Sequence, residues 1–87
     1  DYRLARGQQA LRAGDFTTAT AFADALERAG DTDRAALLRG EVLFAAGEPA
    51  RAIAQFNRIT ADGAIRTRAA ALSGRCLLAL GELAEAE

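Results

Sequence analysis

Residues 38–56 of this 87-residue chain read LRGEVLFAAGEPARAIAQF, and this stretch predicts two helices joined by a tight turn. Gly47 follows a run of helix-forming residues, where a left-handed C-terminal cap favours glycine. Glu48 then places a negative charge at the start of the second helix, and Pro49 fits the first turn, where its missing N–H costs nothing. Gly40 lies inside the first helix. Because glycine there costs about 0.5–1 kcal/mol relative to alanine, it predicts that a partner helix approaches closely.

The same pair of glycines occurs three times. Members of a pair are seven residues apart, and the pairs recur after 33 and then 34 residues: Gly7/Gly14, Gly40/Gly47 and Gly74/Gly81. An acidic residue follows the second glycine each time, and an alanine lies five residues after that glycine: Asp15, Glu48 and Glu82; Ala19, Ala52 and Ala86. The other two glycines, Gly30 and Gly63, each precede a new unit. All eight glycines therefore fit one repeat, which predicts tandem helix pairs.

Helical segments follow from these positions. The expected ranges are 3–13, 16–29, 33–46, 49–60, 65–80, and from 82 to the end of the chain. Connections of two to four residues make neighbouring helices antiparallel. The fifth range is the most apolar, which predicts that it is covered on two sides. The composition agrees, because 51% of the residues are hydrophobic, mainly alanine and leucine, and only one is proline.

The pattern resembles the tetratricopeptide repeat, a helix–turn–helix unit of about 34 residues. The matching residues are the paired glycines, Phe56 of the second unit, and the alanines Ala19, Ala52 and Ala86. The resemblance covers the whole chain, as one array with units at about 1–32, 33–66 and a shortened third at 67–87. It implies an all-α fold, an α-solenoid of antiparallel helix–turn–helix repeats in a right-handed superhelical stack.

Some positions depart from the family pattern. Its aromatic residue early in the first helix is replaced by Arg3, Ala36 and Ala70, and the following leucine by Arg6, Arg39 and Ser73. Its closing proline becomes Asp31 and Ala64. An array of helical hairpins from another family is therefore the alternative. The basic residues are all arginine, which is typical of a GC-rich genome. The resemblance is to a bacterial type of tetratricopeptide protein.

The sequence lacks the residues that most enzymes use. It has no histidine, lysine or tryptophan, and its single serine, Ser73, lies between a leucine and a glycine. Asp31 and Asp33 stand at a helix start, where capping explains them better than a metal ion does. Cys76 lies in the apolar run CLLAL, which favours a buried thiol over a reactive one. We therefore predict a non-enzymatic segment without cofactor or metal.

Charge and hydropathy limit the partners. The net charge is −1 with both signs mixed along the chain, whereas nucleic-acid binders normally show a basic stripe. No run of 18 apolar residues exists, so membrane insertion is not expected, and no signal-peptide pattern is present. These observations favour a protein or peptide as the partner.

The resemblance implies that the first helices of the units line a concave groove for a peptide or partner helix. The repeat register places nine candidate residues there: Leu4, Gln8, Arg12, Arg34, Leu37, Glu41, Phe44, Arg68 and Arg75. Leu11, Ala71 and Leu78 continue the apolar floor. The expected polar column is Gln8, Glu41 and Arg75, with Arg12, Arg34 and Arg68 at its edge.

Arginine binds carboxylates through two parallel hydrogen bonds, so a partner with an acidic element is favoured. The alternative is that these arginines only keep the face hydrated. Some family members clamp a C-terminal carboxylate with Lys and Asn. The matching positions here are Leu4, Gln8, Leu38, Arg68 and Leu72, and only Arg68 keeps the charge, so this specialisation is not expected.

The predicted function is a protein–protein interaction module or scaffold. Structural self-association through an open apolar end and a regulatory arm of a larger enzyme are the alternatives. Reversal of the charge of Arg75 or Glu41 would weaken binding of a groove ligand, whereas light scattering across concentration would detect self-association. RNA binding is opposed by the net negative charge.

Overall fold

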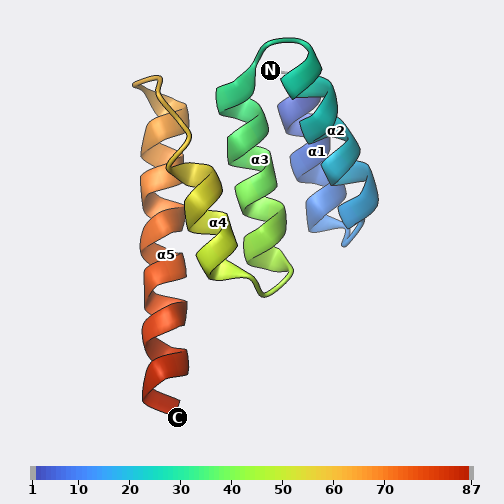
Figure 1. Cartoon of the computed structure of the whole chain (residues 1–87). Coiled ribbons are helices and arrows are strands. Elements are labelled where there is room, and N and C mark those ends of the chain that lie inside the picture. The colour runs from blue at the N-terminus through green and yellow to red at the C-terminus, as the bar shows by residue number, and fades with distance from the viewer. Residues whose placement is uncertain (1, 87) are drawn as a thin grey trace.

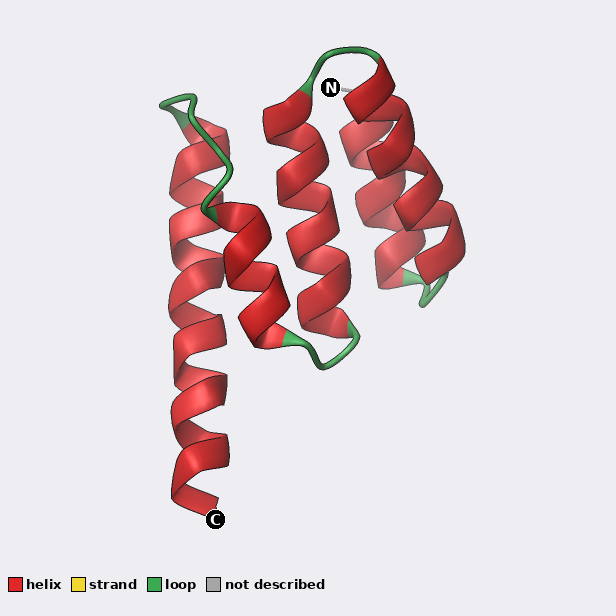
Figure 2. Ribbon diagram, viewed as in Figure 1, coloured by secondary structure: helices red, strands yellow, loops and turns green. Residues whose placement is uncertain are grey.

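The protein is all-α. The computed structural model describes residues 2–86, with side chains described up to residue 81, and no strand occurs in this range (Figures 1 and 2). Its five helices are α1 (Tyr2–Arg12), α2 (Phe16–Arg28), α3 (Thr32–Ala45), α4 (Pro49–Phe56) and α5 (Ala64–Ala86). None of them is long and apolar enough to cross a membrane.

The helices form two layers. Each helix packs against the next one along the chain, and in addition α1 contacts α3 and α3 contacts α5. By contrast, no contact joins α2 to α4 among the described residues. The helices α1, α3 and α5 run in one direction and form a continuous layer, on which α2 and α4 lie separately in the opposite direction (Figure 1). We call α1, α3 and α5 the first-helix layer.

Glycine caps end the first three helices, as the spacing predicts for two of them. Gly14 and Gly47 have φ of 79° and 82°, a left-handed conformation that an L side chain rarely adopts. The following residues, Asp15 and Glu48, each donate their backbone N–H at 2.9 Å to a carbonyl five residues earlier. Asp15 then accepts a hydrogen bond from the Thr18 N–H at 3.1 Å and so caps the next helix.

The break predicted at Gly81 is wrong for this chain. The helix α5 continues through Gly81 to Ala86, so no separate helix begins at residue 82, and Gly81 has no positive φ. At Gly14 and Gly47 the chain turns because the next helix packs back along the previous one. At Gly81 no described helix packs back on α5, and helical hydrogen bonding continues instead.

The helix α4 is shorter than the predicted range 49–60, because it ends at Phe56. The seven residues 57–63 that follow are held by Asp33 of α3. Its carboxylate accepts hydrogen bonds from the backbone N–H groups of Thr60 and Ala61, at 3.1 and 3.0 Å. Asp31 caps α3 as predicted, through the Arg34 N–H at 3.2 Å, whereas Asp33 fixes the loop between α4 and α5.

The core is centred on α3, whose buried residues face both neighbouring hairpins. Two of the predicted close approaches are confirmed. A Cβ atom at Gly7 would overlap the Leu38 side chain, and one at Gly40 would overlap the Phe56 ring. The third position differs, since nothing lies within 4 Å of a Cβ built at Gly74. The helix α5 is therefore covered on one side only, where Cys76 is 0% exposed, and not on two sides as its hydrophobicity predicts.

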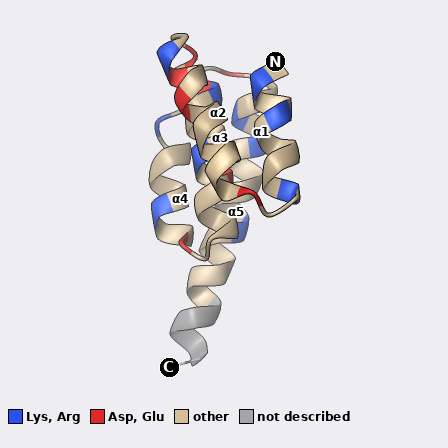
Figure 3. Ribbon diagram, turned by 90° about the vertical axis from the view of Figure 1, so that its right-hand side faces the viewer, with Lys and Arg blue, Asp and Glu red and all other residues tan. Residues whose placement is uncertain are grey.

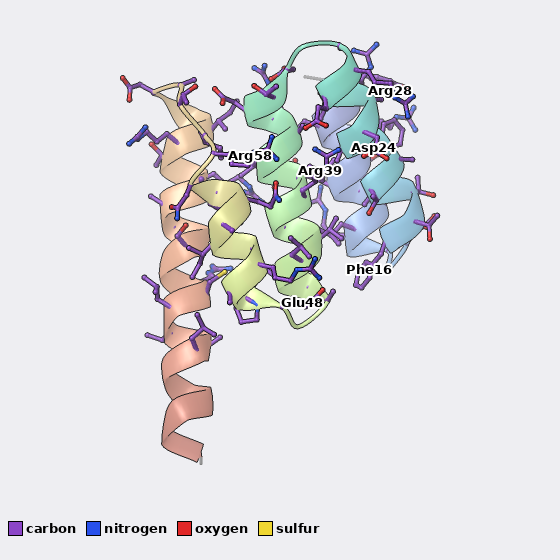
Figure 4. All side chains as sticks on the ribbon, viewed as in Figure 1. Phe16, Asp24, Arg28, Arg39, Glu48 and Arg58 are labelled. Carbon is purple, nitrogen blue, oxygen red and sulfur yellow. The ribbon has the colours of Figure 1, made fainter. Side chains whose placement is uncertain are left out.

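Arg39 connects α2 and α3, at a position where the tetratricopeptide pattern has leucine. It lies between these two helices beside Asp24 (Figure 4). Its guanidinium donates to Asp24 at 2.6 Å and to Glu27 at 2.7 Å. Burial acts to lower the pKa of Arg39, but its hydrogen bonds to these two carboxylates, together with their negative charge, outweigh burial and raise the pKa. These ion pairs join α2 to α3.

Candidate partner-binding face

A polar network crosses the first-helix layer. Glu41 of α3 is only 8% exposed, and both of its carboxylate oxygens accept hydrogen bonds. Gln8 of α1 donates to Oε1 at 2.9 Å, and Arg68 of α5 donates to Oε2 at 3.1 Å. A nearly buried carboxylate needs such partners, because an unpaired one would cost several kilocalories per mole. The network therefore joins one residue from each first helix at a defined point.

A cleft of about 170 Å³ opens beside this network. Its lining residues are Gln8, Leu11, Arg12, Glu41 and Arg68. Arg12 is exposed and has no ion pair among the described residues, and the Arg68 side chain is 54% exposed although it binds Glu41. Two arginines and one glutamate give the cleft a net charge of +1. With the Glu41 oxygens already accepting, the free hydrogen-bonding groups of the two arginines are donors.

The predicted polar column is correct in two of its three members. Gln8 and Glu41 meet as expected, but the third partner is Arg68 and not Arg75. The reason lies in the connections between units. Three residues join α2 to α3, whereas seven join α4 to α5, so α5 need not lie on α3 as α3 lies on α1. The glycine spacing in the sequence does not determine how α5 is placed along α3, nor how far a long arginine side chain extends.

Other predicted groove residues have different environments. Leu37 is 1% exposed and belongs to the core, so it offers no surface to a partner. Leu4 and Phe44 are half-buried and pack against the core with one edge exposed. Arg34 pairs with Asp31 at 2.6 Å at the start of α3. Arg75 is exposed on α5 and does not line the cleft.

The Glu41–Arg68 pairing was not foreseen from the sequence, although a signal for it exists. Glu41 is the only acidic residue in the segment AALLRGEVLFAA, which otherwise contains apolar residues, one glycine and one arginine. An acidic residue on the buried side of such a helix requires a cation or donors from a neighbouring helix. Arg68, in the equivalent helix of the next unit, is such a cation.

The described residues contain no group of three or more His, Cys, Asp or Glu side chains placed to hold a metal ion. Cys76 is a buried free thiol, and burial raises its pKa, which opposes the thiolate form. Arginines are spread over several helices with acidic residues between them (Figure 3).

Comparisons of the chain with protein-family models, with curated proteins and with solved structures give no match. The function is therefore inferred from the polar network and the cleft on the first-helix layer.

Proposed function

We propose that this chain is a protein-interaction module of the tetratricopeptide type, which binds an acidic peptide or partner helix on its first-helix layer. The observation that supports this proposal is the cleft in which Arg12 and Arg68 flank the Gln8–Glu41 pair. The cleft presents hydrogen-bond donors and a net positive charge on a chain whose overall charge is −1. A ligand carboxylate therefore fits it better than a cation does.

The layered packing favours this face as the inner one. The first helices touch one another, whereas α2 and α4 do not. When neighbouring elements are closer on one side than on the other, a stack bends toward the closer side, and repeat proteins use such concave surfaces for binding. The cleft lies on the closer side.

The hydrogen bond to Glu41 also holds the Arg68 guanidinium in a fixed position for a ligand carboxylate. Glu41 holds Arg68 through one nitrogen, Nη2, which leaves donors on the same guanidinium for a ligand. Half-exposed ion pairs contribute only about 0.2–1 kcal/mol each, so Leu11 and Phe44 must add apolar contact for useful affinity. We expect binding in the micromolar range, about −8 kcal/mol, with a marked loss at high salt.

The test is selection of phage-displayed peptides on the immobilised chain, followed by titration of the selected peptides. We expect the selected sequences to be enriched in Asp and Glu, and Arg12→Glu to weaken their binding roughly ten-fold or more, the equivalent of 1.4 kcal/mol. Arg28→Glu is the matched control, because Arg28 is an exposed arginine on α2, away from the cleft. Selection of peptides without acidic enrichment, or equal binding to both variants, would refute the proposal.

A further inference from the structure

Among the described residues, no helix packs over the centre of one face of α5, at Gly74. This face consists of Ala70, Ser73, Gly74 and Leu77, which we call the Gly74 face. Ala70 and Gly74 are exposed, Ser73 is half-buried, and Leu77 is 62% exposed. These residues lie three or four apart, so they share one side of the helix. They form a mainly apolar stripe, and Gly74 at its centre has no side chain.

The two equivalent faces in the same molecule are covered. On α3 the corresponding glycine, Gly40, is buried under α4, and Phe56 lies so close that a Cβ could not be added. On α1 it is Gly7, which is buried beneath Leu38 and the Phe22 Cβ. At Gly74 nothing lies within 4 Å. Among the described residues, a neighbouring helix therefore covers Gly7 and Gly40 but not Gly74.

The Gly74 face is continuous with an existing interface. A cavity of about 200 Å³ lies where α4 meets α5, with Phe56 and Ile59 on one wall and Ala70 and Ser73 on the other. The apolar α4–α5 contact thus extends to the edge of the open face. A helix placed on α5 beside α4 would complete the second layer, in which α2 and α4 already lie.

We propose that the Gly74 face binds one α-helix with the residue pattern of α4, antiparallel to α5 and with an aromatic side chain over Gly74. In α4 this pattern is an alanine and a phenylalanine four residues apart, Ala52 at 0% and Phe56 at 4% exposure. The small residues of the Gly74 face leave room for a ring, as Gly40 does. An interior glycine weakens a helix, and a close helix contact is what offsets that loss at Gly40.

A second copy of this chain is a poorer occupant. Its own Phe56 is buried, so it could be offered only if the α4 of that copy left its place. The exposed aromatic residues of the described chain are Tyr2 and Phe16, and neither has an alanine four residues before it in the same helix. A helix of a partner protein satisfies the pattern without unfolding this chain.

The probe is a labelled peptide with the sequence of residues 48–60, EPARAIAQFNRIT, titrated with the 87-residue chain. We expect saturable 1:1 binding with shifts of the Gly74 and Ser73 amide resonances. A peptide with Phe56→Ala should bind roughly ten-fold more weakly or worse, because it lacks the aromatic anchor.

Adjacent leucines supply a matched pair of variants. Leu77 and Leu78 are 62% and 69% exposed, but successive residues of a helix point about 100° apart, so only Leu77 belongs to the Gly74 face. Leu77→Glu should abolish peptide binding and Leu78→Glu should preserve it. Gly74→Ala should also weaken binding, while the melting temperature of the free chain does not fall, which separates blocked docking from misfolding.

Three results would overturn the proposal. The first is no binding at millimolar peptide, and the second is binding whose amide shifts fall on Gln8 and Glu41 and not on Gly74. The third is a dimer in sedimentation velocity, without peptide, that Leu77→Glu dissociates, since a second copy would then be the occupant.

Discussion

The substitution of alanine for glycine should have opposite effects at two equivalent positions. Gly40 and Gly74 both lie inside helices and are related by the repeat. A Cβ built at Gly40 lies 2.6 Å from Phe56 Cζ and 2.7 Å from Cδ1, about 1 Å closer than the carbon–carbon contact of about 3.5–4.0 Å allows. At Gly74 the same atom meets nothing within 4 Å.

The magnitudes follow from two terms. Replacing an interior helical glycine by alanine gains about 1 kcal/mol of helix propensity at either site. Forcing an extra carbon into a packed core costs typically about 1–3 kcal/mol, and the upper end applies to Gly40 because Phe56 is a rigid ring in the core. Gly40→Ala should therefore lower the unfolding free energy by about 2 kcal/mol, and Gly74→Ala should raise it by about 0.5–1 kcal/mol.

Urea unfolding followed by circular dichroism at 222 nm measures both changes. A change of 1 kcal/mol corresponds to about 4–8 °C in a chain of this size, so thermal melts should show a fall for Gly40→Ala and a smaller rise for Gly74→Ala. Adding Phe56→Leu to Gly40→Ala should cost less than the two single changes summed, because the smaller side chain relieves the overlap. Stabilisation by Gly40→Ala, or strict additivity with Phe56→Leu, would refute the packing argument.

Three further predictions concern local contacts. Asp33→Ala should destabilise the chain by about 1–2 kcal/mol and speed hydrogen exchange in the loop after α4, because two backbone N–H groups lose their acceptor; unchanged exchange there would contradict this role. Hydrogen bonds from the side chain and backbone of Thr18 lower the pKa of Asp15, so its contribution to stability is present above the ordinary aspartate pKa and lost as pH falls through the lowered value. In Thr18→Ala an NMR titration should find the Asp15 pKa closer to its ordinary range. Cys76 should react with a thiol reagent at pH 8 roughly a hundred-fold more slowly than in urea, because it is buried and its pKa is raised; equal rates would show that α5 is open.

The glycine register predicted the helix pairs because glycine has direct physical consequences. A positive φ at Gly14 and Gly47 and a close helix contact at Gly7 and Gly40 are local requirements that a sequence records. The all-helical class followed from these positions and from the composition. The break expected at Gly81 was wrong, because α5 continues through this glycine and a glycine alone does not end a helix.

The candidate face could be predicted only in part. Gln8 and Glu41 occupy the same position in successive repeats, 33 residues apart, so residue counting predicted that they lie close together. Arg68 takes the place predicted for Arg75, because seven residues connect α4 to α5. Leu37 is buried in the core, because the repeat register does not show which groove residues a neighbouring helix covers. Asp33 lies in the first turn of a helix as predicted, but it does not act as a cap: its partners lie 27 and 28 residues away, and no local pattern reveals them.

The central position of α3 has a consequence for how the chain gains and loses its structure. Among the described residues, helices touch only when they are next to each other or one apart along the chain, and α3 alone contacts both hairpins. Contacts so close in sequence close short loops, which favours rapid assembly outward from α3. The outer helix pairs, α1–α2 and α4–α5, can then unfold and refold separately. A chain that is pulled or digested with protease from one end should therefore unfold in steps and not in a single transition.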